Sequence, residues 1–545
     1  MRSATRLPRI LENRSVQPEL FDVSRLGAHG RFAVIALAIA ILGGCAVGPK
    51  YDRPDQQMPA AFPEEAGNLT SGPALAGDWW KLYRDPRLDE LVVSALTRNV
   101  DLALAVAQIR EAEAVVRETG AAVLPEIDVG GNSNRTASSS STALPSPAGL
   151  PTVRTGHRAV FQTSFELDFW GKLRDATSAA QSRLLAQRYS RDMVRLLLAS
   201  TVAQNYFTLR SLDAQIAMTR TTIGTRDVTL KIVGDRVNAG YASDLDLAQS
   251  RLARANAGSQ LRELERLRSG VEHQLQTLTG RLDAKVAADN VAPSTVTGNV
   301  AGNNVAGSSI ATTNVLELPL PALPPPGLPS TLVDRRPDVA SAEQNLISAN
   351  AQIGVARAAQ YPTFSLTGFL GGESESLRNI ISAPARIWSV GLNVLYPIFD
   401  AGKYAARTAQ AEARQQQALA NYRKTVEIAY RDVSDALSNL RQTIVAETDL
   451  RNALAASREA LRIGQARYDA GYSGFLDVLD AQRNVNDAEL ALARNRQQQL
   501  NYTVDFIKAI GGGWTAESSN TATSPTSPTS PTSPTSPTSP TSPKS

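Results

Sequence analysis

Two long stretches of the chain, residues 171–237 and 402–468, have a helical pattern, and towards the end of each stretch apolar residues recur every seven positions. The spacing is strict at the end of the first stretch, which carries Val202, Leu209, Ile216, Ile223, Leu230 and Val237. The second stretch keeps Val433, Leu440, Leu454, Leu461 and Tyr468, and Glu447 interrupts it. This pattern predicts long helices that pack as a coiled coil. At about 1.5 Å per residue the first helix would reach roughly 100 Å, far beyond a compact domain.

Both stretches belong to one unit that occurs twice. The segment from Arg236 to Asp246 reappears without gaps as Arg467 to Asp477, at an offset of 231 residues. Because 231 is a whole number of heptads, both copies share one helical register. Each long helix meets a glycine turn, Gly240-Tyr241 or Gly471-Tyr472, and then a second leucine-rich stretch, so each half is predicted to end in a helical hairpin.

A period of two appears elsewhere in each half. Apolar and polar residues alternate over 158–169 and 388–396, and shorter runs at 126–131 and 363–371 would be their hairpin partners. Such strands suit the wall of an outer-membrane barrel, apolar towards lipid and polar towards the lumen, although a soluble half-buried hairpin shows the same alternation.

The remaining segments divide the chain. Helical patterns over 85–123 and 332–360 precede the strands, and each is predicted to stop at a proline, Pro125 or Pro362. Residues 132–155 are expected to form an external loop, because they are rich in Ser, Gly and Pro. We therefore expect a first repeat at 85–280, a linker or equatorial region at 281–331 and a second repeat at 332–514. The linker is rich in Pro, Gly, Asn and Val without a clear period, so we expect extended structure or disorder there. The Thr-Ser-Pro tail at 515–545 is expected to stay extended or disordered.

The N-terminus predicts a lipoprotein signal peptide. An apolar run too short to span a bilayer ends in Leu42-Gly-Gly-Cys45. This tetrapeptide resembles the lipobox, which implies cleavage after residue 44, acylation of Cys45 and an extended lipidated segment over 45–84. The alternatives are a short anchor helix and a buried cysteine.

Charge and composition argue against several functions. The chain has three His and one Cys, and its sequence contains no phosphate-binding loop, paired metal motif or nucleophile elbow, so we expect no enzyme activity, cofactor or metal site. Residues 1–44 hold six arginines and three carboxylates, so the mature chain falls from a net charge of +4 to +1. This balance gives no support to nucleic-acid binding, which needs a localised basic face.

Four strands cannot close a barrel, and an open sheet edge is intolerable in lipid. Two copies would make an eight-stranded barrel too narrow to conduct, whereas three make a barrel of twelve strands. A homotrimer is therefore the expected assembly.

Several motifs occur in order over about residues 45–514: Cys45 to Pro54, Trp79-Trp80 before Asp85-Pro86, Arg335-Arg336-Pro337-Asp338, Leu476 to Arg483, and Lys508 to Trp514. The resemblance that they carry is to the outer membrane factor or TolC-like family, in the lipoprotein branch that serves tripartite efflux systems of the RND type. It implies a mainly α fold with a β-barrel part, in which a homotrimeric 12-stranded transmembrane barrel continues into a periplasmic α-helical coiled-coil barrel.

The resemblance also implies a function. The trimer would be a passive outer-membrane exit channel for drugs, metals or other small solutes, lipid-anchored in a Gram-negative bacterium. It would dock to a periplasmic adaptor and an inner-membrane RND-type pump, and the exposed turns at Gly240, Tyr241, Gly471 and Tyr472 would contact the adaptor. A type I protein secretion duct shares this fold, and a non-transporting periplasmic coiled-coil lipoprotein would explain the helices and Cys45 but not the strands.

The hairpin tips are the predicted gate. Asp477 and Asp480 are three residues apart, so both can face one side of a helix, and in a trimer they would form rings of carboxylates that favour cations. The alternative role is stabilisation of the helix N-terminus through the dipole. Arg467 and Asp246 are predicted to form a latch between the two hairpins, the alternative being a solvated pair of little energetic consequence.

Overall fold

The computed structural model describes residues 47–55, 58–62, 75–139, 151–282, 315–325 and 332–515. The predicted signal peptide, Cys45, the tail beyond residue 515 and most of the 281–331 linker lie outside these ranges. The described chain forms two compact units. Within the described ranges, one comprises residues 47–49, Gly120–Ala176 and Gln352–Thr408 and contains the strands, and the other comprises the described residues of 50–119, 177–351 and 409–515 and contains the helical hairpins.

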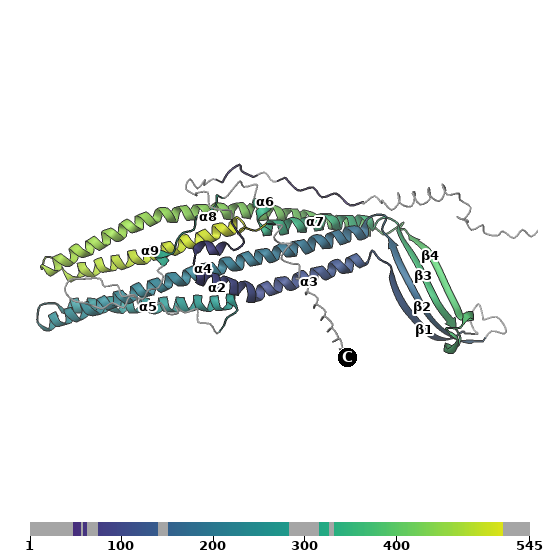
Figure 1. The fold of residues 1–545 in the computed structure, drawn as a ribbon, viewed down its shortest axis with the longest axis horizontal. Helices are drawn as coiled ribbons and strands as arrows, with labels where there is room; N and C mark the ends of the chain where they lie inside the picture. Colours follow the sequence, from purple (N-terminus) through teal and green to yellow (C-terminus); the bar gives the residue numbers. More distant parts are fainter. Residues whose placement is uncertain are drawn as a thin grey trace, which may run out of the picture. The chain divides into compact units, whose positions relative to one another are not determined.

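Four antiparallel strands form one sheet, with β1 (Glu126–Ala137), β2 (Val153–Leu167), β3 (Thr363–Ser374) and β4 (Arg386–Leu395) side by side in chain order (Figure 1). The four predicted strands are therefore confirmed, and the β2–β3 pairing joins the two halves. The strands are longer than their hydrophobic alternation indicated. β1 and β2 continue into the segment expected to be a loop, because polar residues also satisfy their backbone groups across a hairpin.

The register gives the sheet two chemically different faces. Phe161 on β2 is opposite Val129 on β1 and Leu370 on β3, and Leu370 is opposite Trp388 on β4. This face is apolar and exposed in the protomer; its large exposed apolar side chains are Ile127, Val129, Val153, Phe161, Leu366, Leu370, Trp388, Val390, Leu392 and Val394. The opposite face carries every carboxylate of the four strands, namely Glu126, Asp128, Glu166 and Glu373.

The helix expected over 85–123 is two helices, so that prediction was wrong in detail. α2 (Pro86–Arg98) ends at Asn99, whose side-chain oxygen accepts hydrogen bonds from the amides of Asp101 (2.8 Å) and Leu102 (3.3 Å) and so caps α3 (Val100–Ala121). The second half breaks similarly, between α6 (Leu332–Arg335) and α7 (Pro337–Ala358). In both halves the longer helix ends a few residues before the predicted proline.

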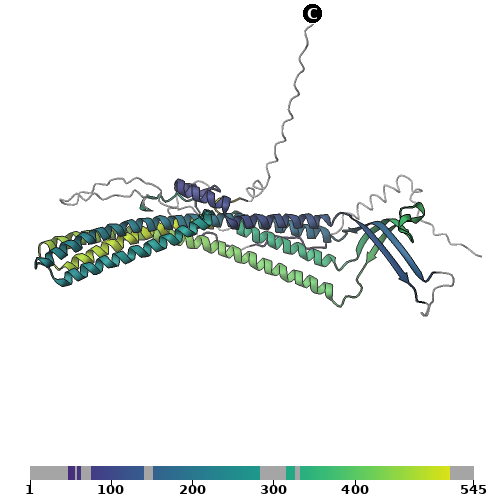
Figure 2. The ribbon, with the colours of Figure 1, turned by 90° about the horizontal axis from the view of Figure 1, so that it is seen from below.

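The long first helix of each hairpin is confirmed within one residue of its predicted bounds, and a second helix returns in each half as predicted. α4 (Lys172–Asn238) turns into α5 (Asp244–Thr279), and α8 (Lys403–Asp469) turns into α9 (Phe475–Ala509). Figure 2 shows these hairpins side by side with both turns at the same end. Of the heptad positions, Val202, Leu209 and Ile216 are buried, whereas Ile223, Leu230 and Val237 near the turn are half-buried. Packing within the protomer thus loosens towards the tips.

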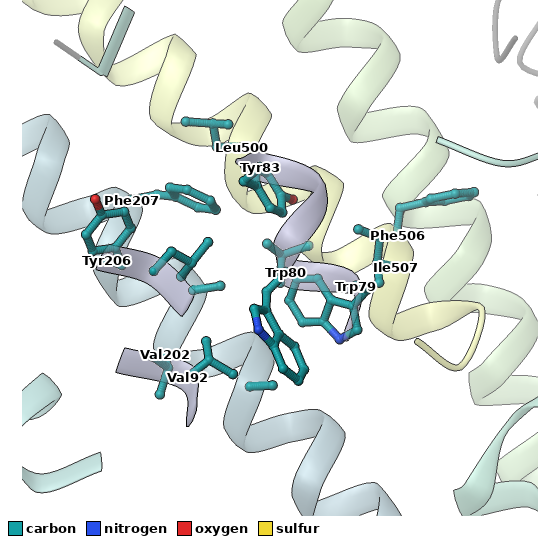
Figure 3. Packing of buried hydrophobic residues seen from close by; sticks show 14 of the residues in the cluster. Trp79, Trp80, Tyr83, Val92, Val202, Tyr206, Phe207, Leu500, Phe506 and Ile507 are labelled. Atoms are coloured by element: carbon teal, nitrogen blue, oxygen red, sulfur yellow. The ribbon is translucent and has the colours of Figure 1, made fainter. Parts of the chain in front are cut away.

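The largest core cluster lies where the hairpins meet α2 and the preceding short 3-10 helix η2 (Trp79–Tyr83) (Figure 3). Trp79 and Tyr83 are fully buried, and the Tyr83 ring lies 4.8 Å from that of Phe207 on α4. The Tyr83 hydroxyl is 2.6 Å from that of Thr503 on α9, so the buried polar atom has a partner. The tryptophan motif therefore joins both hairpins to α2.

Part of the linker also belongs to this core. Val315, Leu318 and Leu323 are buried in the cluster, although the sequence led us to expect extended structure or disorder over 281–331. The described residues 315–325 begin with a short 3-10 helix, η3 (Val315–Glu317), and their packing against the core was not indicated by the sequence. Three apolar residues without a helical or strand period give no sequence signal, and their burial depends on neighbours far away in the chain.

Two further motifs hold the hairpin ends together. Arg336 is 3% exposed, donates to the Ala509 carbonyl (3.1 Å) and pairs with Asp338 (2.6 Å) and Asp432 (3.2 Å). The backbone of Gly511, at φ +92°, passes so close to Arg335 that an added Cβ would lie 1.9 Å from its carbonyl oxygen. In this region, the motifs that carry the family resemblance therefore make buried packing contacts.

Candidate gate at the hairpin tips

Both hairpins turn with the same backbone motif. Gly240 and Gly471 adopt φ +79° and +78°, a conformation that glycine enters without the strain of a Cβ. The following Tyr241 amide bonds the Arg236 carbonyl at 2.8 Å, and Tyr472 bonds that of Arg467 at the same distance. These are Schellman C-caps. Tyr241 and Tyr472 are 86% and 79% exposed, so each tip presents an aromatic ring to solvent.

The two turns differ at the start of the returning helix. Ser243 forms a capping box on α5: its hydroxyl accepts from the Asp246 amide (3.2 Å), and the Asp246 carboxylate accepts from the Ser243 amide (3.2 Å). The corresponding residue of the second hairpin is Gly474, which has no side-chain cap to offer α9. The first tip is therefore fixed more firmly than the second.

Asp477 and Asp480 share the exposed side of the first turns of α9. Both are exposed, whereas Phe475 and Val478 on the other side are 4% and 1% exposed. Asp480 also lies 3.3 Å from Arg483 one turn further on, in a half-exposed ion pair. The predicted spacing therefore holds, and both carboxylates are free of the hairpin's packing.

Arg467 and Asp246, the predicted latch, have other neighbours in the protomer. The Asp246 carboxylate accepts from the Ser243 hydroxyl at 2.8 Å, and the Arg467 side chain is exposed. A pair between them stays a prediction for the assembled protein.

A different contact joins the hairpins near the tips. The Arg236 guanidinium donates to the Tyr468 hydroxyl at 3.2 Å and lies 5.5 Å from the centre of its ring. The Tyr468 ring in turn lies 5.4 Å from that of Phe475. This contact was not predicted from the sequence. The repeat nevertheless marks the position, because at an offset of 231 residues Tyr468 replaces Val237 in the heptad pattern.

Further from the tips, polar residues line cavities between the helices. A cavity of about 310 Å³ is bordered by Leu252 and Ala253 of α5 and by Asp480 and Arg483 of α9. Arg226 of α4 borders it as well, donates to the Ala253 carbonyl and has its pKa lowered by burial.

A second cavity, of about 280 Å³, also borders Arg226 and extends to Leu461 on α8. Beside it the Thr222 hydroxyl on α4 bonds Asn486 on α9 at 3.1 Å. Towards the tips, the two hairpins are thus joined by polar contacts with cavities between them. Such an arrangement allows the hairpins to move relative to each other.

Comparison with known proteins gives the family. The family model described as outer membrane efflux protein matches residues 91–281 and 328–512. The solvent efflux pump outer membrane protein SrpC of Pseudomonas putida is 30% identical over 492 residues, covering 88% of this chain and 98% of its own. Outer membrane protein OprJ of Pseudomonas aeruginosa is 30% identical over 508 residues, covering 89% and 96%.

Solved structures agree in fold. The CmeC outer membrane channel of Campylobacter jejuni superposes with a TM-score of 0.76 at 24% identity, covering 88% of this chain and 98% of its own. The open-state MtrE outer membrane channel of Neisseria gonorrhoeae gives a TM-score of 0.72 at 27% identity, covering 86% and 98%.

This chain belongs to the outer membrane efflux protein family. It has the TolC-like fold that its sequence predicted, and it is an outer-membrane efflux component of the Gram-negative type and not an enzyme.

Proposed function

We propose that three copies of this chain form a lipid-anchored exit duct. Their strands close into one barrel across the outer membrane, and their helical hairpins surround the same axis in the periplasm. The duct conducts solutes passively, while an adaptor and an inner-membrane pump supply recognition and energy.

The sheet carries this proposal. Its apolar face is exposed in the protomer, with Val129 at 72%, Val390 at 71% and Trp388 at 72%, which suits contact with lipid. In the described chain β1 and β4 are its edges, and unpaired backbone groups are not tolerated in a bilayer. In this order, closure pairs β4 of one protomer with β1 of the next, and three copies give a lumen lined by the polar face.

Small apolar or drug-like solutes are the proposed cargo. The relatives' names include solvent, toluene and antibiotic efflux pumps. The tyrosines of both tips, Tyr241 and Tyr472, together with Gly240 and Gly471, are the proposed adaptor contact, because these two rings are the most exposed large apolar side chains of the described hairpins.

The proposed gate is the set of carboxylates at the start of α9. Three copies of Asp477 and Asp480 would approach around the axis when the hairpins converge and would attract cations while narrowing the passage. Opening requires the hairpins to separate, and within the protomer the Arg236–Tyr468 contact opposes this. A pair between Arg467 and Asp246 would oppose it in the same way.

Cys45 is the proposed lipid attachment. Changing Cys45 to Ser should abolish incorporation of labelled palmitate and leave the uncleaved precursor in the cells. Labelling equal to that of the native protein would exclude acylation at this residue.

The duct is tested by purification of the mature protein in detergent. We expect a trimer by native mass spectrometry that inserts into planar bilayers and conducts in discrete steps. A monomer that never conducts would contradict the proposal and favour a periplasmic scaffold.

A further inference from the structure

Two arginines lie on the otherwise uncharged apolar face of the sheet. Arg135 of β1 follows Ile127 and Val129 at even spacing, and Arg386 of β4 precedes Trp388 and Val390 in the same way. The pairing places both on the face of Phe161. No carboxylate lies on this face of the four described strands.

Both arginines lie equally far from the inner ends of their strands. Arg135 lies nine residues beyond Glu126, the first residue of β1, and Arg386 lies nine residues before Leu395, the last residue of β4. At about 3.3 Å per residue these nine residues extend roughly 30 Å along the strand. With a strand tilt near 40° they rise roughly 23 Å, close to the height of the apolar band of an outer-membrane barrel, about 25 Å.

This places both guanidinium groups at the outer rim of the apolar band. The opposite rim is marked by Trp170, whose indole donates to the Pro362 carbonyl (2.7 Å) and stacks on Tyr361. At the outer rim, Trp388 lies beside Arg386 on the same face and is 72% exposed. Aromatic residues at both limits are typical of a membrane-spanning strand.

Neither arginine has its charge balanced within the described chain. Arg135 and Arg386 are exposed, and the structure shows no ion pair between either of them and a described residue. Arg158, at the same end of the sheet on the polar face, differs: its guanidinium lies 3.9 Å from the Glu373 carboxylate and 4.7 Å from the centre of the Phe369 ring.

The two arginines occupy opposite edges of the sheet, β1 and β4. In the proposed trimer, β4 of each protomer adjoins β1 of the next, so Arg386 and its neighbour's Arg135 come together at one height facing lipid. Two like charges at the edge of a low-dielectric layer repel each other unless an anion lies between them.

From this arrangement, which rests on the proposed trimeric duct, we propose that each seam between protomers binds a phosphoryl group of an outer-leaflet glycolipid. Guanidinium groups donate forked hydrogen bonds that match phosphate oxygens. The acyl chains of the lipid would lie along the apolar face below, beside Trp388 and Val390. A trimer has three such seams, and the bound lipid bridges neighbouring protomers.

The test is native mass spectrometry of the full-length mature trimer titrated with bis-phosphorylated lipid A, and separately with the same lipid after removal of its phosphates. We expect up to three tightly bound phosphorylated lipids per trimer and at least about tenfold weaker binding of the phosphate-free lipid, a ratio that corresponds to about 1.4 kcal/mol. Equal binding of the two lipids by the native protein would overturn the proposal without any variant.

In the variant Arg135→Gln/Arg386→Gln, the preference for the phosphorylated lipid should fall at least about tenfold, because two charge-assisted contacts are lost. Arg154→Gln is the matched control, since Arg154 lies at the same end of β2 on the polar face, and it should bind as the native protein does. Native-like binding by the double variant would overturn the seam site.

A conductance measurement distinguishes failure of the seam site from failure of the proposed trimeric duct. A trimer that conducts normally but ignores the lipid phosphate overturns the seam site alone. Failure of the native protein to form a trimer overturns the proposed duct and the seam with it.

Discussion

The guanidinium of Arg236 on α4 and the phenol of Tyr468 on α8 join the two hairpins of one protomer close to their tips, through a 3.2 Å hydrogen bond and a cation–π contact at 5.5 Å. Both residues adjoin the Schellman turns, where packing is loosest. Any motion that separates the hairpins at this end has to break this contact.

Changing Tyr468 to Leu should therefore favour the open duct. An exposed cation–π contact contributes about 0.5–1 kcal/mol, so the open fraction should rise about two- to fivefold. Tyr468→Phe keeps the ring and loses only the hydroxyl, and its effect should be smaller. Single-channel recording measures both variants, and equal open fractions in native protein and Tyr468→Leu would contradict this role.

The capping box should make the first hairpin tip more resistant to local opening than the second. Ser243→Ala removes a side-chain cap that contributes about 1 kcal/mol, so hydrogen exchange at the first turn of α5 should accelerate about fivefold. Gly474→Ser is the matched change in the other repeat. Gly474 has φ −73° and ψ 158°, close to the −89° and 153° of Ser243, so a serine there can cap α9 and slow its exchange. Unchanged exchange in both variants would show that the caps do not control the tips.

Asp175 near the start of α4 should make the protein less stable at neutral than at mildly acidic pH. One of its carboxylate oxygens is buried without a hydrogen-bond partner in the described chain, beside the backbones of Gly48 and Gly354. Burial, helped by the nearby charge of Asp168, raises the pKa of this carboxyl above its usual value of 3.8. The folded state therefore binds the proton more tightly than the unfolded chain, and this group's contribution to stability rises as pH falls through the folded pKa.

Asp175→Asn removes that dependence. It should raise the unfolding temperature at pH 8 more than at pH 5, as measured by thermal unfolding in detergent. Asp449→Asn on the exposed surface of α8 is the control and should change neither value. A loss of stability at both pH values would show that the ionised carboxylate is needed.

The sequence could predict most of the fold because its elements are regular and long. The helical pattern and the glycine turns placed the long first helix of each hairpin within a residue, and alternation located all four strands. The break at Asn99 was missed because a single capping side chain inside an apolar pattern does not interrupt its period. The burial of Val315 was missed because it depends on tertiary neighbours alone.

The candidate gate was predictable in its place but not in its contacts. The repeat located both turns and the carboxylates of α9, whose side chains share one exposed side. The contact joins two residues that are 232 positions apart in the chain, Arg236 and Tyr468, and it depends on the relative position of their helices, which no periodicity supplies. The contact made by Asp246, in contrast, could have been predicted. Asp246 follows Ser243 by three residues, the spacing of a capping box, and this box occupies its carboxylate in the protomer.

The most direct test of the gated duct is single-channel conductance and ion selectivity of the mature protein, measured beside Asp477→Ala/Asp480→Ala. We predict a small, cation-selective native channel and a variant with larger conductance and weaker selectivity. Identical conductance and selectivity in the two proteins would contradict a gate made by these carboxylates.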